Sequence, residues 1–222
     1  DSDVDVDILI VGGGGGGGAR GGGGGGGGIL FKESIRLLDR ELIINVGRGG
    51  LGSTKWTNTG NNGIDSSVTM NNITYIANGG GGGASIQNIA GVNGGNGGGG
   101  SRGGAGASGQ GANSTQQEYD QWESYGNKGG DGLFRSAINI EHMGGGGGAG
   151  SKGFDGLDDG YGGRGKEFIS YFGSNVGDNG YFSGGGGGLV HKGYDYGYNY
   201  GDNDLHSDVL SNIVYSLSLI HI

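Results

Sequence analysis

Proline and cysteine are both absent from this chain of 222 residues. At an average usage of about 5%, a chain of this length would contain about ten prolines. Collagen requires proline and disordered linkers are usually rich in it, so neither class accounts for the sequence. Proline is also the residue without a backbone N–H, so its absence leaves the backbone donors available for hydrogen bonding. The absence of cysteine excludes disulfides, zinc–thiolate sites and thiol nucleophiles.

Positive charge and long hydrophobic runs are scarce as well. The 13 Lys and Arg residues stand against 22 Asp and Glu residues, and the formal net charge is -9 at pH 7. An acidic chain of this kind is disfavoured as a partner of nucleic acid. No run of about eighteen apolar residues is present, as a membrane-spanning helix would require. We therefore expect neither a nucleic-acid partner nor membrane insertion.

We expect that neither end of the sequence is a natural terminus. The chain begins at Asp1 without a signal-like segment, so we expect a fragment whose single glycine-rich domain spans residues 1–216. Residues 217–222, LSLIHI, resemble the translated transposon-end adapter of a sequencing library, which would make the gene metagenomic. The alternative is a real terminal β-strand, because apolar and polar residues alternate acceptably over residues 212–222, NIVYSLSLIHI.

Glycine is what the chain has in abundance, with 65 residues. The first run follows the strand-like segment Ile8–Val11, as in the fingerprint of a dinucleotide-binding enzyme. That fingerprint requires a helix after its glycines, and each glycine in a helix costs about 0.8–1.0 kcal/mol relative to alanine. Here glycine fills residues 12–18 and 21–28, and no Gly-Lys-Ser/Thr follows. We therefore expect no bound cofactor.

Long glycine runs can instead build a core from backbone alone. A polyproline-II chain has three residues per turn, a rise of about 3.1 Å and no internal hydrogen bonds, so its N–H and C=O groups point sideways. Without side chains, neighbouring chains approach until these groups pair and form a polyglycine-II bundle. Such a bundle requires runs of similar length joined by turns, and Ala19 with Arg20 fits the first turn. The main runs are 12–18, 21–28, 79–83, 97–100, 144–148 and 184–188.

Glycine also recurs at every third position. On a chain with three residues per turn, this spacing places glycine along one whole edge. A disordered linker has no reason to keep such a phase, so the period favours the bundle. The two series are 91, 94, 97, 100, 103, 106 and 109, and 144, 147, 150, 153 and 156.

Segments rich in β-branched and aromatic residues separate the glycine runs and predict a small antiparallel β-sheet scaffold. Asn71 and Asn72 predict a hairpin turn, and residues 34–41 are the one candidate helix. Together these features predict an all-β, partly irregular fold in which a polyglycine-II bundle is attached to the sheets. The expected strands are Val4–Val11, Ile29–Arg36, Glu41–Val46, Val68–Ile76, Leu133–Ile140, Glu167–Phe172 and Val209–Ser216.

The order of these blocks resembles two known families. A strand leads into GGGGGGG, a two-residue turn, GGGGGGGG and a hairpin, and VGRGG, NGGGGG and GGAGASGQGAN follow. Over roughly residues 4–190 this resembles the glycine-rich domains of phage tail-fibre adhesins and of the anaplastic lymphoma kinase and leukocyte receptor kinase extracellular region. The resemblance implies polyglycine-II bundles attached to β-structure and, for the adhesins, loops at one end that bind host receptors. The kinase-type domain carries cysteines that this chain lacks, which favours a phage or microbial surface protein.

Residues suited to catalysis or metal binding are dispersed. His142, His191 and His206 are widely spaced and lack a signature neighbour, so we expect them in solvent-exposed loops. The sequence FDGLDDG, which begins one residue before Asp155, is a candidate calcium loop, and a solvated turn is the alternative. We expect a protein that is not an enzyme and that holds no metal.

Aromatic residues gather in two polar stretches, QQEYDQWESYGN and KGYDYGYNYGDND. Tyrosine among Ser, Gly and Asn is the composition of antibody binding loops, and aromatic rings with amide and carboxylate neighbours suit sugars. The alternative is that these rings pack on the sheet or against the ends of the glycine runs. The candidate receptor- or glycan-binding residues are Tyr119, Trp122, Tyr125, Tyr194, Tyr196, Tyr198 and Tyr200.

The expected function is therefore that of an extracellular or virion-surface domain, not an enzyme, whose aromatic loops bind a cell-surface receptor or glycan. A structural subunit of an extracellular filament or matrix is the first alternative, with the loops making contacts to other subunits of a fibre. Ice binding is a further alternative, although the acidic interruptions argue against the flat, uncharged face that it requires.

Overall fold

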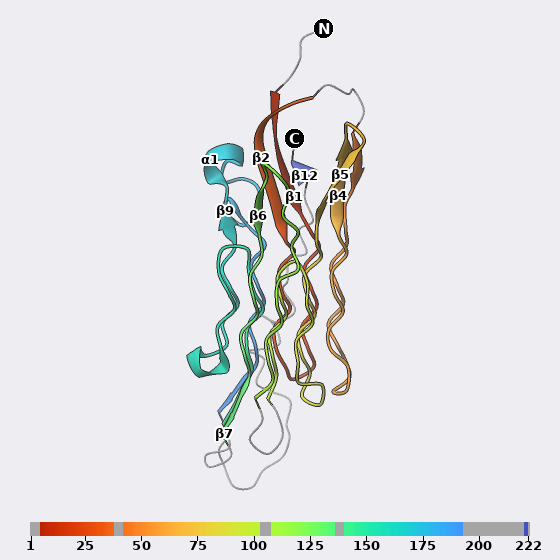
Figure 1. Cartoon of the computed structure of the whole chain (residues 1–222). Coiled ribbons are helices and arrows are strands. Elements are labelled where there is room, and N and C mark those ends of the chain that lie inside the picture. The colour runs from red at the N-terminus through yellow and green to blue at the C-terminus, as the bar shows by residue number, and fades with distance from the viewer. Residues whose placement is uncertain (1–4, 38–41, 103–107, 136–139, 193–219, 222) are drawn as a thin grey trace.

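The computed structural model describes residues 5–37, 42–102, 108–135, 140–192 and 220–221. The molecule is elongated, with most strands gathered at one end and glycine-rich segments running side by side along its length (Figure 1). Short antiparallel sheets make up the regular structure, and the described residues include one α-helix, of four residues. The predicted all-β class with small antiparallel sheets is confirmed.

The strands of the described residues form four small sheets. One sheet has the order β12-β1-β2-β6, two others have the orders β3-β4-β5 and β11-β8-β7, and β9 pairs with β10. The elements are β1 (Asp5–Val11), β2 (Ile29–Arg36), β3 (Ile43–Asn45), β4 (Ser66–Met70), β5 (Ile73–Ala77), β6 (Glu123–Tyr125), β7 (Leu133–Arg135), β8 (Ile140–His142), the 3-10 helix η3 (Gly156–Asp158), β9 (Lys166–Glu167), α1 (Ile169–Phe172), β10 (Tyr181–Phe182), β11 (Val190–Lys192) and β12 (Ile220–His221).

The hairpin between β4 and β5 turns at the predicted residues. Asn71 and Asn72 have φ angles of 50° and 60°, as the two-residue turns that suit a twisted hairpin require. Met70 and Ile73 pair directly on either side of them. The predicted turn is therefore confirmed, as are the strands expected over Val4–Val11 and Ile29–Arg36, the first of them from Asp5 onward.

The candidate helix over residues 34–41 is wrong where it is described, because residues 34–36 belong to β2. Val6 pairs with Ile35 there, and both side chains pack against a buried cluster. Strand pairing and side-chain burial at these residues outweigh the weak helical pattern of the sequence. Residues 38–41 lie outside the described residues, as do residues 136–139 and 209–216 of two predicted strands.

The strand predicted over Glu167–Phe172 is also wrong beyond its first residue. β9 ends at Glu167, and α1 occupies Ile169–Phe172. Phe168 and Phe172 are four residues apart, the spacing that places two side chains on one side of a helical turn. Their rings lie 5.0 and 6.1 Å from the ring of Phe31. Contact with a buried ring distant in sequence thus selects the helical turn.

The sheet that contains β1 and β2 is buried on both faces. On one face, Ile8, Ile10 and Leu30 pack with Val68 of β4. On the other face, Leu9, Val11 and Ile29 pack with Phe31 and with Phe168 and Phe182. Successive side chains of a strand point to opposite faces, so burial on both faces explains why residues 8–11 are uninterruptedly apolar.

Residues 220 and 221 form the outer strand of that sheet. Ile220 pairs with Ile10, and His221 pairs with Leu9. These two residues belong to the segment 217–222, and the adapter origin of that segment stays a prediction. The assignment of residues 1–216 to a single domain also stays a prediction.

Residues 21–28, which we call the central segment, are hydrogen-bonded to five other segments. The first of these, residues 12–18, runs antiparallel to it after the turn at Ala19 and Arg20, as predicted. One hydrogen bond to each of the five neighbours, given from donor to acceptor with its N···O distance, is Gly12 N to Gly28 O (3.0 Å), Gly22 N to Ala84 O (2.8 Å), Gly99 N to Gly23 O (2.8 Å), Gly23 N to Gly144 O (3.1 Å) and Gly186 N to Gly24 O (2.9 Å).

The hydrogen bonds between these segments recur every third residue. Gly12, Gly15 and Gly18 donate to the central segment at 2.8–3.0 Å, and Gly22, Gly25 and Gly28 donate onward to the segment 78–84. A chain with three residues per turn presents its N–H groups in this order. The interior at these segments therefore consists of backbone groups, which explains why glycine is abundant there.

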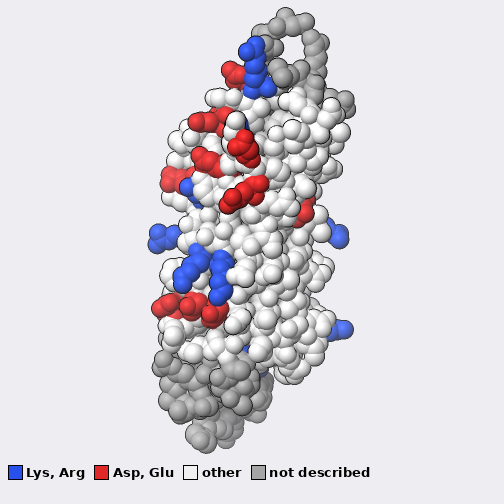
Figure 2. Space-filling model, viewed as in Figure 1, with Lys and Arg blue, Asp and Glu red and all other residues white. Residues whose placement is uncertain are grey.

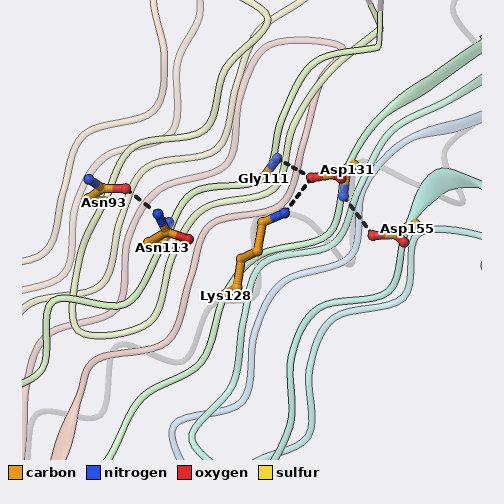
Figure 3. A network of polar contacts seen from close by, with 6 residues as sticks. All are labelled: Asn93, Gly111, Asn113, Lys128, Asp131 and Asp155. Atoms are coloured by element: carbon orange, nitrogen blue, oxygen red, sulfur yellow. Dashed lines mark hydrogen bonds and ion pairs between the residues drawn. The ribbon is translucent and has the colours of Figure 1, made fainter.

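Short polar side chains take the place of carbonyl groups at the outer segments (Figure 3). Asp131 Oδ1 accepts hydrogen bonds from Gly111 N at 2.8 Å and Lys128 Nζ at 2.9 Å, and Asp131 N donates to Asp155 Oδ1 at 2.8 Å. Burial alone would raise the pKa of Asp131, but the hydrogen bonds from Lys128 and Gly111 outweigh it and hold the pKa below its usual 3.8. Asp131 and Asp155 thus accept backbone N–H groups here, as carbonyl groups do between the glycine segments.

Candidate functional site

An acidic and aromatic surface lies at the end of the molecule where the strands gather. Figure 2 shows Asp and Glu side chains concentrated at this end, where α1, β6 and β9 lie in Figure 1. We call one group of these residues, with the tyrosines beside them, the tyrosine–carboxylate patch. It consists of Asp7, Glu33, Glu123, Tyr125 and Tyr171, and it includes one of the predicted binding residues, Tyr125.

The strand register places the patch on one face of the sheet. Ile29 pairs with Tyr125 and Phe31 pairs with Glu123, so these β6 side chains share a face with Ile29 and Phe31. The register between β1 and β2 shifts just beyond Phe31. There the backbone N–H of Ser34 donates to Asp7 Oδ1 at 2.9 Å, which fixes a carboxylate at the end of the same face.

Helix α1 adds the second tyrosine to this face. The rings of Tyr171 and Phe31 are 4.6 Å apart and tilted by 58°. Phe31 is buried, whereas Tyr171 is 44% exposed. Tyr171 therefore rests on a fixed aromatic base and presents part of its ring to solvent.

Tyr125 carries a carboxylate and an ammonium group as neighbours. Its hydroxyl donates to Glu123 Oε2, and Lys166 Nζ lies 4.3 Å from the centroid of its ring. Desolvation by burial is the main reason that the pKa of Tyr125 is raised to about 12, and the hydrogen bond to Glu123 adds to it. The phenol thus stays neutral well above the pH at which a free tyrosine ionises.

Tyr171 lies within the field of three carboxylates. The negative charge of Glu33 is the main cause that raises the pKa of Tyr171 above 10.0, and desolvation, a hydrogen bond to Glu33 and the charges of Glu123 and Asp7 add to it. The patch therefore joins an exposed ring to a concentration of negative charge. Such a surface can stack on an apolar group and accept hydrogen bonds from a ligand.

We expect Tyr125 to ionise with a pKa of about 12, compared with 10.0 for an ordinary tyrosine. Because the raised pKa belongs to the folded state, the stability that it contributes is complete below pH 10 and is lost as the pH rises towards 12. A titration of the tyrosine ring-carbon resonances by NMR, assigned with Tyr125→Phe, measures it. Glu123→Gln should lower the pKa only in part, since burial is the larger cause; Glu167→Gln should leave it unchanged. Ionisation of Tyr125 near 10 would contradict this account.

The other predicted binding residues pack or lie outside the described residues. Trp122 is only 9% exposed, and its ring stacks on Tyr75 at 4.5 Å and 29°. Tyr119 lies beside the same ring, and its hydroxyl accepts the N–H of Ile76 at 3.1 Å. Trp122 and Tyr119 thus anchor β5, and the four tyrosines Tyr194, Tyr196, Tyr198 and Tyr200 lie outside the described residues.

Sequence reasoning missed Tyr171 and the carboxylates around it. A local signal exists for part of the patch, because Glu123 and Tyr125 are two residues apart and so share one face of a strand. No such signal marks Tyr171, which lies in the segment predicted as a strand, Glu167–Phe172.

The remaining sites considered from the sequence contribute little chemistry. His142 lies in β8, half-buried rather than in an exposed loop, with Nδ1 2.7 Å from the carbonyl oxygen of Gly156. His191 falls in β11, and His206 lies outside the described residues. Within the described ranges, no group of three or more His, Asp or Glu side chains is arranged to hold a metal ion. Nor does the part of the chain that the structure covers contain a helix long and apolar enough to span a membrane.

Comparison with known proteins identifies the chain at the level of a family. The model of a glycine-rich domain family matches residues 2–208. No curated protein and no solved structure matches the chain. Since the match covers nearly the whole sequence, the chain belongs to the glycine-rich domain family.

Proposed function

We propose that this glycine-rich domain is a binding domain of the cell exterior or virion surface, not an enzyme. In this proposal the glycine segments form a rigid polyglycine-II bundle, and the sheet end presents a surface to a cell-surface receptor or glycan. The order of blocks that resembles phage tail-fibre adhesins supports this assignment.

The proposed bundle is supported by the hydrogen bonds of the central segment. The central segment is hydrogen-bonded to five neighbours, and donors recur at every third residue, as expected when extended chains with three residues per turn pack side by side. A core of this kind has no side-chain rotamers to rearrange. It would hold the sheet end in a fixed position, and a preorganised surface loses less entropy when it binds.

The observation that carries the proposed binding role is the exposed ring of Tyr171. It lies on the buried ring of Phe31 at 4.6 Å, beside the carboxylates of Glu33 and Glu123. An immobilised tyrosine offers a large amphipathic contact at low entropic cost. Carboxylates next to it can accept hydrogen bonds from sugar hydroxyls or from a receptor.

Tyr171→Ala should weaken binding to the target surface at least about tenfold, as expected when an interface loses its aromatic anchor. The measurement is a screen of the intact chain on glycan arrays and whole cells, followed by titration of the strongest target. Tyr161→Ala is the matched control, because Tyr161 is 64% exposed and its ring contacts Phe154, which is not part of the patch. Unchanged binding by Tyr171→Ala, or an equal loss in both variants, would contradict the assignment.

A filament or matrix subunit is the second candidate, and one observation favours it. Exposed apolar side chains gather on residues 43–64, which include the outer strand β3 and the segment after it. Exposed apolar side chains of this kind are suited to contacts between subunits. Ordered fibres in electron micrographs of the purified chain would favour this candidate over a receptor-binding domain. The exposed side chains are Ile43, Ile44, Val46, Leu51, Trp56 and Ile64.

A further inference from the structure

We propose that the tyrosine–carboxylate patch recognises a cationic amine on its ligand, such as the ammonium group of an amino sugar. This inference rests on the proposed binding function and names the chemical class of its ligand. The juxtaposition that carries it is an exposed tyrosine ring, packed at a tilt against Phe31, with the carboxylates of Glu123 and Asp7 on the same face of the sheet.

Among the described residues, negative charge dominates the surroundings of Tyr171. Glu33, Glu123 and Asp7 all act on its hydroxyl, and Glu123 pairs with Phe31, the residue against which Tyr171 packs. Lys166 lies over Tyr125. Lys32, next to Glu33 in sequence, binds Gln121 instead, with Nζ 2.9 Å from its carbonyl oxygen and 3.1 Å from Oε1. The field at Tyr171 is therefore negative, which attracts cations and repels anionic ligands.

Lys166 shows that an ammonium group fits this surface. Its Nζ lies 4.3 Å from the ring centroid of Tyr125, within the range of about 6 Å over which a cation is attracted to an aromatic face. The hydroxyl of the same ring donates to Glu123, so this ring carries an ammonium group on its face and a carboxylate at its hydroxyl. Tyr171 has the same combination of ring and carboxylates and is 44% exposed.

The two parts of the patch select for different features of a ligand. A tyrosine ring stacks on any apolar sugar face, whether or not the sugar is charged. The carboxylates instead favour a positive group placed beside that face, and they penalise carboxylated or phosphorylated ligands by like-charge repulsion. The expected ligand thus carries an apolar face and an adjacent amine.

The test compares glucosamine with N-acetylglucosamine, which differ in the charge on one nitrogen. Titration calorimetry of the intact chain, at a mildly acidic pH where the amine is protonated, should give about tenfold tighter binding of glucosamine. Added salt should reduce this preference, because exposed charges are screened. The combined variant Glu33→Gln with Glu123→Gln should abolish the preference. Glu167→Gln is the matched control, since Glu167 is exposed and its carboxylate pairs with Tyr181 outside the patch.

The possible outcomes separate this inference from the proposed function. Equal binding of the two sugars, or a preference that survives the double Gln variant, would overturn the recognition of a cation. If binding to cells or glycan arrays still depended on Tyr171 in that case, the proposed function would stand with a neutral ligand. If neither cells nor glycans bound the chain and glucosamine did not bind, both proposals would fail.

Discussion

Gly24→Ala should lower the free energy of unfolding by at least about 3 kcal/mol, the upper end of what overpacking costs in a side-chain core. Gly24 lies in the middle of the central segment. A Cβ at this position would lie 2.7 Å from the carbonyl carbon of Gly15 and 2.9 Å from that of Gly16, and closer still to the oxygen of Gly15. Real Cβ atoms do not approach other atoms so closely.

The loss should be this large because every atom in the way belongs to the backbone. In a side-chain core a neighbour can change rotamer to admit a methyl group, whereas here a whole segment must move. The segment around Gly15 donates to Gly25 at 2.8 Å, so its displacement breaks hydrogen bonds on both sides. We expect the damage to spread from one residue to several segments.

Gly184→Ala provides the matched control, within another glycine run. The nearest atoms to a Cβ at Gly184 are 3.7 and 3.8 Å away, which is ordinary contact. Alanine restricts the unfolded chain more than glycine does, so this variant should be neutral or more stable by about 0.4–1 kcal/mol. Denaturant unfolding followed by circular dichroism measures both variants. Similar stabilities for Gly24→Ala and Gly184→Ala would show that close backbone contact is not what requires glycine in the central segment.

The glycine core could be predicted from the sequence because its signal is local. Gly12, Gly15 and Gly18 donate at intervals of three residues, which is the interval expected of an extended chain with three residues per turn. The strand over Ile8–Val11 is similar, since an uninterrupted apolar run indicates a strand buried on both faces. Neither prediction requires knowledge of which segment lies next to which.

The patch could not be predicted in the same way, because contacts between distant residues create it. Tyr171 reaches the face of the sheet only because α1 forms, and α1 depends on the contact of Phe168 and Phe172 with Phe31. The packing of Trp122 has the same origin. The polar residues next to Trp122 in the sequence predict an exposed ring, but Tyr75 of β5 stacks on that ring.

Asn96→Leu tests the polar side chains that complete the backbone core. Asn96 is fully buried, and its Oδ1 accepts the N–H of Asn127 at 2.7 Å while its Nδ2 donates to Gly27 O at 2.7 Å. Leucine has a similar size but leaves the N–H of Asn127 without a partner, which costs about 1–3 kcal/mol. Gly27 O still accepts a hydrogen bond from the hydroxyl of Ser183. Asn96→Leu alone therefore does not leave this carbonyl oxygen without a partner.

The combination of Asn96→Leu with Ser183→Ala should therefore cost more than the sum of the two single variants, because only together do they leave Gly27 O unpaired. Asn93→Leu is the control, one turn earlier in the same repeat. Asn93 Oδ1 also accepts a backbone N–H, from Asn113 at 2.9 Å, but this pair is exposed and water can replace it, so the change should stay within about 0.5 kcal/mol. Equal losses for Asn93→Leu and Asn96→Leu would mean that burial does not set the value of these hydrogen bonds. Additive losses at Asn96 and Ser183 would mean that the two side chains do not share Gly27 as their acceptor.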